Sequence, residues 1–155
     1  MVEDNPDDEL LTLDALGSAG LDSSETKCEI VVTRDGVEAL DYLFARGAYK
    51  GRDQDFQPSL VLLDLKLPKL SGFEVLERIR ADEITRLMPV VLLTSSSLEE
   101  DMIRGYKSGA NSFVRKPVQF DRFLEAMRSL GQYWLKVNEV PARANSKEAR
   151  NGNST

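Results

Sequence analysis

The sequence predicts an α/β fold built on a parallel β-sheet with helices on both faces. Short runs rich in β-branched and aliphatic residues alternate with amphipathic stretches of helical periodicity. The run LVLLDL is apolar at nearly every position, as expected of a parallel strand that is buried on both faces. Because single helices separate the strands, right-handed βαβ crossovers follow, and these place helices on both sides of the sheet.

The individual elements can be placed from periodicity and capping residues. A short first strand is expected at Met1-Val2, and the others at Glu29–Thr33, Leu60–Leu65, Val90–Thr94 and Ser112–Val114. The helices are expected from Pro6, over Asp35–Phe44, Phe73–Ala81 and Glu99–Ser108, and from about Asp121. Asn5 suits the N-cap of the first helix, and Gly47 and Gly109 are interpreted as stops. Apolar stripes are assigned to the core, including Val37, Leu40 and Phe44 and, in the last helix, Phe123, Leu124, Met127, Leu130 and Trp134.

Two polar stretches lie outside this alternation. Gly17–Lys27 is expected to be a loop, and Pro141–Thr155, which has almost no large apolar residue, is expected to be loosely attached. The chain is therefore divided into one domain over residues 1–136 and a flexible extension over residues 137–155.

Composition excludes several classes of protein. The 155 residues suit one domain, and 41% hydrophobic residues suffice for a core. The chain has no histidine, which excludes Ser-His-Asp and Cys-His catalysis and HExxH zinc sites, and its single Cys28 makes a thiolate metal cluster implausible. A net charge of −6 argues against nucleic-acid binding. No apolar run approaches the ~18 residues of a membrane span, and MVEDNPDD does not resemble a signal peptide, so a cytoplasmic location is expected.

Polar residues that could bind a ligand or take part in catalysis stand at the ends of successive strands. Glu3 and Asp4 follow Met1-Val2, while Asp64, Thr94 and Lys116 stand at the ends of three later strands. Ligands of open α/β sheets bind beyond the carboxyl ends of the strands, so these side chains are expected to converge. Clustered carboxylates repel one another unless a cation joins them, and in a chain without histidine that cation is expected to be Mg²⁺.

Each residue also has an ordinary structural explanation. Asp64 could be a turn residue, Glu3-Asp4 could cap the first helix, Thr94 could cap the following helix, and Lys116 could be a solvated surface lysine. The occurrence of all of them at successive strand ends favours a functional site.

The same residues resemble a known family over about residues 1–136. VEDN, VLLDLKLPKLSGFEVL, VVLLTSS and GANSFVRKPV resemble the receiver domain of two-component response regulators. DGVEALDYLFARGAY resembles the single-domain regulators that partner phytochrome-type histidine kinases. The resemblance implies a five-stranded CheY-like (flavodoxin-like) sheet of order 2-1-3-4-5.

By position, the resemblance also implies a role for each candidate residue. Asp64 would be the phosphoacceptor, with Thr94 and Lys116 contacting the phosphoryl group. Mg²⁺ would be held by Glu3, Asp4, Asp64 and the backbone carbonyl of Lys66. Phe113 would be the aromatic switch residue, and Pro117 would follow a cis peptide bond.

The resulting expectation is a phosphorylation-dependent switch. A histidine kinase would phosphorylate Asp64, an ionised carboxylate that needs no general base, and the regulator would signal by protein contacts. It would promote only its own phosphorylation and dephosphorylation and is not expected to be a conventional enzyme. A homodimer through the last helix and its extension is also expected, because Trp134 and Leu135 would point to different sides of a regular helix.

Two other interpretations remain open. With only two residues in the first strand, Glu3 and Asp4 would be poorly held, which leaves room for a pseudo-receiver that never accepts phosphate; alternatively, the sequence starts late. A haloacid-dehalogenase-like phosphohydrolase would need an Asp where Lys66 stands and is disfavoured. The absence of GxxxxGK[ST] excludes a Walker-type NTPase.

Overall fold

The computed structural model describes residues 1–18, 28–117 and 119–141. Its sheet contains β1 (Val61–Leu63), β2 (Val90–Thr94) and β3 (Ser112–Arg115), which are parallel and ordered β1-β2-β3. The predicted α/β class is confirmed, and β2 has the predicted bounds. Every residue of β1 and β2 is buried, which agrees with central strands covered on both faces.

The segment before the first helix extends this sheet by single bridges. Val2 forms isolated parallel bridges with Thr33 and with Leu63. The Val2 amide donates to the Leu62 carbonyl at 2.8 Å, and the Asp64 amide donates to the Val2 carbonyl at 3.2 Å. Of the predicted strand Glu29–Thr33, only Thr33 forms a bridge, although the Met1 ammonium also donates to the Val31 carbonyl at 2.8 Å.

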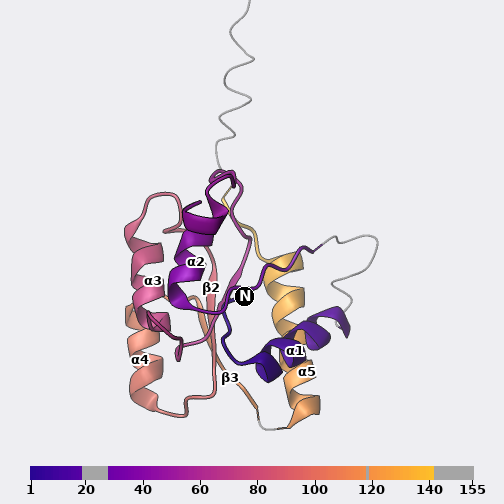
Figure 1. Ribbon diagram of the computed structural model, residues 1–155. Helices are drawn as coiled ribbons and strands as arrows, with labels where there is room; N and C mark the ends of the chain where they lie inside the picture. The colour runs from indigo at the N-terminus through magenta and orange to yellow at the C-terminus, as the bar shows by residue number, and fades with distance from the viewer. Residues whose placement is uncertain (19–27, 118, 142–155) are drawn as a thin grey trace, which may run out of the picture.

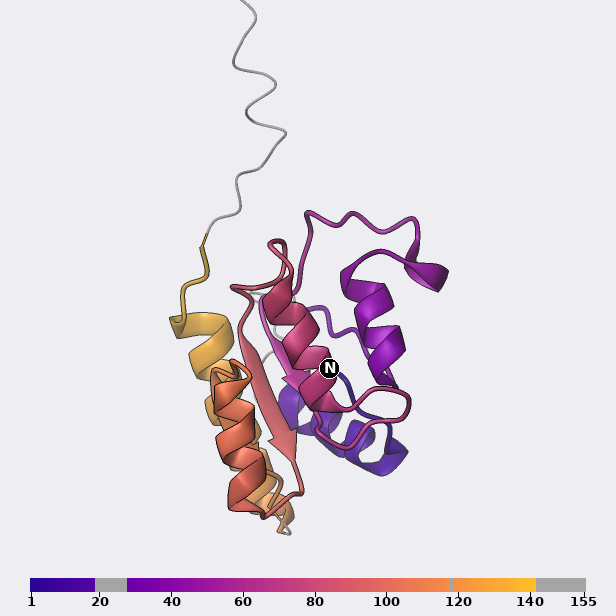
Figure 2. The same ribbon diagram turned by 90° about the vertical axis from the view of Figure 1, so that its left-hand side faces the viewer.

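The helices cover the sheet in two layers. α2 (Gly36–Leu43), α3 (Gly72–Ala81) and α4 (Glu99–Lys107) lie on one face, and α1 (Pro6–Leu16) and α5 (Phe120–Gly131) lie on the other (Figures 1 and 2). A 3₁₀ turn, Gly47–Tyr49, follows α2. α2 ends earlier than the predicted stop at Gly47, while Gly109 has a φ of +101° and ends α4 as predicted.

Side-chain caps fix where three helices begin. Asn5 accepts hydrogen bonds from the Asp7 and Asp8 amides, which confirms the predicted N-cap of α1. Asp35 accepts from the Glu38 amide at the start of α2. α3 begins with a capping box in which Ser71 and Glu74 satisfy each other's backbone amides.

Each helical layer has its own apolar cluster. The layer under α2 and α3 includes Leu40, Leu63, Val75, Leu76, Ile79 and Leu92. The layer under α1 and α5 includes Leu16, Leu62, Val91, Leu93, Phe123 and Met127. Val37, predicted to be in the core, is instead exposed, because α2 turns Ala39, Leu40 and Leu43 inward.

A cavity of about 410 Å³ lies at the amino end of the sheet. Its wall is mostly apolar and includes Leu16, Leu43, Leu62, Ile79 and Leu135. This end of the sheet therefore differs in chemistry from the carboxyl end, where the acidic residues gather.

The chain beyond α5 forms a π-helical segment, η3 (Gln132–Val137). Trp134 and Leu135 are both half-buried and both pack against the apolar cluster under α1 and α5. The expectation that they point to different sides of a regular helix is therefore wrong. A π-helix has more residues per turn than an α-helix, which brings neighbouring side chains closer to one face.

The predicted loop Gly17–Lys27 is wrong at its first residue. Gly17 keeps α-helical backbone angles, with φ −60° and ψ −46°, and caps α1. Residues 19–27 and 142–155, which hold the rest of this loop and nearly all of the predicted tail, lie outside the described residues.

Candidate functional site

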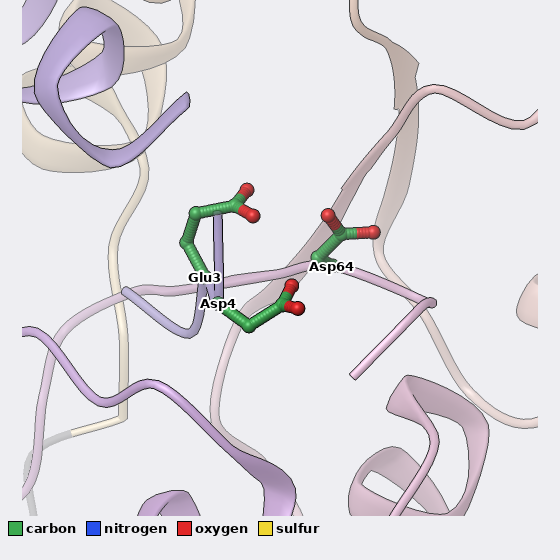
Figure 3. Close-up of side chains that lie close together, drawn as sticks. All are labelled: Glu3, Asp4 and Asp64. Carbon is green, nitrogen blue, oxygen red and sulfur yellow. The ribbon is translucent and has the colours of Figure 1, made fainter. Parts of the chain in front are cut away.

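Three carboxylates come together at the carboxyl end of β1 (Figure 3). Glu3 and Asp4 follow the bridging residue Val2, and Asp64 follows the last residue of β1. One carboxylate oxygen from each of the three lies within 4.8 Å of the others. Glu3 is only 3% exposed and Asp64 is also buried, whereas Asp4 is exposed. The predicted convergence of these residues is therefore present, and the two-residue first segment does hold Glu3 in place.

The turn after β1 sets the position of Asp64. The Lys66 amide donates to the Asp64 carboxylate at 3.2 Å, and the Gly72 amide donates to the Leu65 carbonyl at 2.9 Å. A Cβ on residue 72 would lie 2.1 Å from the Asp64 carbonyl oxygen, which is closer than a non-bonded carbon atom can approach. Glycine at position 72 therefore allows α3 to begin directly against the site.

Lys116 links these carboxylates to the far edge of the sheet. Its amide donates to the Thr94 carbonyl at 2.7 Å, which fixes the chain beyond β3. Its ammonium donates to Glu3, to Asp8 at 2.9 Å and to Asp64 at 3.0 Å. The Lys116 side chain is only 8% exposed, so these contacts are largely shielded from solvent.

The charge balance of the site follows from this geometry. Burial alone would lower the pKa of Lys116, but its hydrogen bonds to Glu3 and Asp8 and the charge of Asp64 raise that pKa above its usual value. Burial raises the pKa of the Glu3 carboxyl, and the hydrogen bond from Lys116 offsets only part of this effect. One cation thus faces three carboxylates, and Lys116 remains charged.

Asp8 was not among the sequence-predicted site residues. A carboxylate in the first turn of a helix such as α1 is ordinarily explained by a favourable interaction with the helix dipole. The contact with Lys116 depends on how α1 lies against the end of β3. The sequence offers one signal, since a helix that starts at Pro6 directly after Glu3-Asp4 keeps its first turn near the acidic pair.

Two predicted residues lie on the neighbouring strands. Thr94 ends β2 and is fully buried, and its hydroxyl accepts from the Ser96 amide at 3.1 Å. Phe113, in β3, is half-buried against the apolar cluster under α2 and α3. Gly105 of α4 lies beside the Phe113 ring, and a Cβ there would lie only 2.6 Å from the Leu92 side chain, so glycine allows α4 to pack closely on the sheet at this point.

The peptide bond before Pro117 is not cis. All peptide bonds among the described residues are trans, and Lys116 and Pro117 are both described, so this prediction is wrong. For an X–Pro bond the trans form is the more stable by about 0.5–1 kcal/mol, and the contacts of Lys116 are made without a cis bond.

The donor set of Glu3, Asp4 and Asp64 suits a hard divalent cation. All three offer carboxylate oxygen, the preferred ligand of Mg²⁺ and Mn²⁺, and the cluster is more negative than Lys116 alone can balance. The exposed Asp4 leaves one side of the cluster open to water, which Mg²⁺ usually retains as a ligand.

The parallel α/β fold, with buried carboxylates at the strand ends and a lysine across from them, defines a class of signalling domains. Residues 6–128 match the family described as "Response regulator receiver domain". The chain belongs to this family, whose members act in two-component signalling and are generally phosphorylated on an aspartate. Receiver domains are signalling proteins and not, in general, conventional enzymes.

Individual relatives are similar over nearly their whole length. The probable methanogenesis regulatory protein FilR2 of Methanothrix harundinacea is 37% identical over 93% of this chain and 87% of its own. Response regulator Rcp1 of Synechocystis is 32% identical over 92% and 91% of the two chains. The crystal structure of the phosphorylated cyanobacterial phytochrome response regulator RcpA has a TM-score of 0.81 at 34% identity, covering 91% and 95%. The Mn²⁺-bound form of Rcp1 has a TM-score of 0.80 at 32% identity, covering 91% and 96%.

The resemblance to receiver domains and to phytochrome response regulators is thereby confirmed. None of the helices within the described ranges combines the length and apolar character needed to cross a bilayer.

Proposed function

We propose that Asp64 is the phosphoacceptor of this response regulator. The observation that carries the proposal is its position at the end of β1, buried, 3.0 Å from the Lys116 ammonium and within 4.8 Å of the Glu3 and Asp4 carboxylates. Asp64 also accepts a hydrogen bond from the Lys66 amide in the turn that follows β1, which helps to hold its carboxylate in position.

The proposed reaction is in-line phosphoryl transfer from a phosphohistidine of a histidine kinase. An oxygen of the ionised Asp64 carboxylate attacks phosphorus, the P–N bond breaks, and its electron pair leaves with the imidazole nitrogen. Lys116 and the Thr94 hydroxyl would face the equatorial oxygens. Mg²⁺, held by Glu3, Asp4, Asp64 and the Lys66 carbonyl, would neutralise charge on those oxygens. The domain would thus promote only its own phosphorylation and dephosphorylation.

The proposed output is a change of surface beyond the site. Thr94 would turn toward the new phosphoryl group, and Phe113, which now packs beside Gly105 of α4, would move into the space released. Lys116 and Pro117 connect the same site to the start of α5. The face made by α4, β3 and α5 would then contact the downstream protein.

The proposal extends to architecture and setting. The bridges of Val2 to Thr33 and Leu63 support the five-stranded order 2-1-3-4-5, with residues 1–136 as the receiver domain and 137–155 as an extension. Likeness to phytochrome response regulators supports a phytochrome-type kinase as partner. The net charge of −6 supports signalling by protein contacts and not by binding nucleic acid, and the lone cysteine is compatible with a cytoplasmic location.

A homodimer through α5 and η3 is also part of the proposal. Trp134 and Leu135 pack inward, so the supporting observation is now the apolar side chains left outside, namely Tyr133, Val137 and Val140. A two-fold axis along this surface would bury them on both protomers.

Sedimentation tests the dimer. Wild type is expected to sediment as a dimer at tens of micromolar, and Val137→Glu as a monomer, because a charge would be buried in the interface. Glu139→Gln, which alters an exposed neighbour without adding charge, is the matched control. A monomeric wild type would refute this assembly.

Incubation with acetyl phosphate and Mg²⁺ tests the phosphoacceptor. Intact mass is expected to show one phosphoryl group on wild type and none on Asp64→Asn, because an amide is not a nucleophile toward phosphorus here. Asp53→Asn, an exposed substitution in another loop, should be phosphorylated like wild type. Equal incorporation in Asp64→Asn would refute the assignment, and no incorporation in a folded wild type would favour the pseudo-receiver.

A further inference from the structure

The hydrogen-bonding capacity of Lys116 is fully used. An ammonium group has three N–H donors, and here one goes to each of Glu3, Asp8 and Asp64. A phosphoryl oxygen on Asp64 can bind this ammonium only if one of the existing acceptors is given up or shared.

The three acceptors differ in what it costs to release them. The Glu3 side chain is 3% exposed and that of Asp64 is 10% exposed, so either would be left unpaired away from water. The Asp8 side chain is 37% exposed and can be rehydrated. Glu3 and Asp64 also belong to the carboxylate cluster suited to a cation, and Asp8 does not.

The surroundings of Asp8 leave room for its side chain to move. A hollow of about 150 Å³ between α1 and the start of α5 is lined by Asp8 and Lys116, together with Leu11, Pro117, Phe120 and Phe123. The two helices lie side by side on the same face of the sheet (Figure 1). The contact between Asp8 and Lys116 therefore spans α1 and the β3–α5 connection across an incompletely filled space.

We propose that Asp8 is a positioning residue that holds the Lys116 ammonium toward α1 in the unphosphorylated protein. It competes with the phosphoryl oxygens for this donor and sets how readily Lys116 turns to them. On phosphorylation the Lys116 ammonium keeps its hydrogen bond to Glu3 and exchanges its hydrogen bond to Asp8 for one to the phosphoryl group. The link between α1 and the β3–α5 connection is thereby released. This inference rests on the proposed role of Asp64.

The test is binding of beryllofluoride, an anionic analogue of a phosphoryl group on a carboxylate, in the presence of Mg²⁺. Asp8→Asn keeps the size of the side chain and weakens the contact with Lys116. Removing any negative charge near the site would also favour an anion, so the matched control is Asp7→Asn, an exposed carboxylate of the same helical turn that the structure does not pair with Lys116.

Asp8→Asn is expected to bind beryllofluoride about two- to five-fold more tightly than Asp7→Asn, the range for a partly exposed ion pair. Amide NMR titrations of the folded proteins measure this. Equal or weaker binding by Asp8→Asn would overturn the proposal.

A double-mutant cycle shows whether the effect passes through Lys116. In a Lys116→Gln background, Asp8→Asn and Asp7→Asn are expected to bind beryllofluoride equally. A persisting difference would mean that Asp8 acts by another route and would also overturn the proposal. A different result would contradict the proposed function itself. If wild type does not respond to beryllofluoride, or if Asp64→Asn responds equally, Asp64 is not the phosphoacceptor. This outcome is distinguishable from a failure of the role proposed for Asp8.

Discussion

The two ends of the parallel sheet differ sharply in chemistry. At the carboxyl end, Glu3 and Asp64 are buried against Lys116. At the amino end, Leu62 and Ile79 line a largely apolar cavity of about 410 Å³. Both ends are made by the same strands, only a few residues apart along each of them.

This difference separates what the strands do for stability from what they do for function. Burying charge is costly and is tolerated at the carboxyl end because Lys116 and the open side at Asp4 compensate for it. Apolar burial at the amino end stabilises the same strands and so holds the charged residues in place. Substitutions at the two ends should therefore have separable effects.

The largest change in stability is expected from Lys116→Ala. Removing the cation leaves the Glu3 carboxyl buried without its partner, and breaking a buried ion pair from one side costs about 3–5 kcal/mol. The free energy of unfolding, measured by urea denaturation at pH 7, should fall by this amount. The matched control is Lys69→Ala, whose ammonium is exposed and whose loss should lower the free energy of unfolding far less.

The loss in Lys116→Ala should depend on pH. Burial already raises the pKa of Glu3, and without Lys116 the two largest influences that lower this pKa disappear, so that only the hydrogen bond from the Asn5 amide still opposes burial. A carboxyl whose folded pKa exceeds its unfolded value of about 4.3 contributes stability at low pH and loses it as pH rises through the folded value. The deficit relative to wild type should thus be larger at pH 7 than at about pH 5. A deficit that does not grow with pH would mean that Glu3 is not the stranded charge.

Ile79→Ala probes the amino end. Ile79 is fully buried and lines the cavity, so its truncation enlarges a space that is already there and should cost about 2–5 kcal/mol of unfolding free energy. Ile103→Ala, an exposed substitution on α4, should change stability by no more than about 0.5 kcal/mol. Beryllofluoride binding by the folded Ile79→Ala protein should match wild type; its loss would show that the two ends are not separable.

Asp4→Asn probes the cation cluster alone. Asp4 is exposed, so stability should change little, but removal of one carboxylate ligand should weaken Mg²⁺ binding about tenfold or more, or ~1.4 kcal/mol. An amide NMR titration with Mg²⁺ measures this, with Asp7→Asn as the control for lost charge. Equal affinities in the two variants would mean that Asp4 only contributes to the general negative field.

The smallest change in stability is expected at the N-cap of α2, which belongs neither to the carboxylate cluster nor to the apolar cavity. Asp35→Ala removes the N-cap of α2 and should cost about 1 kcal/mol at pH 7. Hydrogen bonds from Lys69 and from the Glu38 amide lower the pKa of Asp35, so its contribution is present above the unfolded pKa and is lost as pH falls through the folded value. The difference from wild type should therefore shrink in acid, and a constant difference would argue against the charged cap.

Much of the site followed from the sequence because parallel strands end at the same edge. Asp64 and Lys116 each stand just beyond a strand, so their contact could be expected from the strand directions alone. The contact of Asp8 with Lys116 could not be predicted in this way, because it depends on the angle at which α1 lies on the sheet.

The remaining misses concern features that tertiary contacts decide. Residues 29–32 have the composition of a strand, yet they form no bridge, and Met1 contacts them through a hydrogen bond to the Val31 carbonyl. Periodicity assumed a regular α-helix beyond Gly131, whereas the π-helical segment brings both Trp134 and Leu135 against the core. Family likeness suggested a cis bond before Pro117, and the contacts of Lys116 form without one.

The central claim is that Asp64 itself carries the phosphoryl group. Borohydride reduction of the protein after treatment with acetyl phosphate and Mg²⁺ converts an aspartyl phosphate to homoserine, which peptide mass spectrometry can locate. The account predicts homoserine at position 64, with aspartate retained at positions 4 and 8. Homoserine at position 4 or 8, or a phosphoryl group that resists reduction, would contradict it.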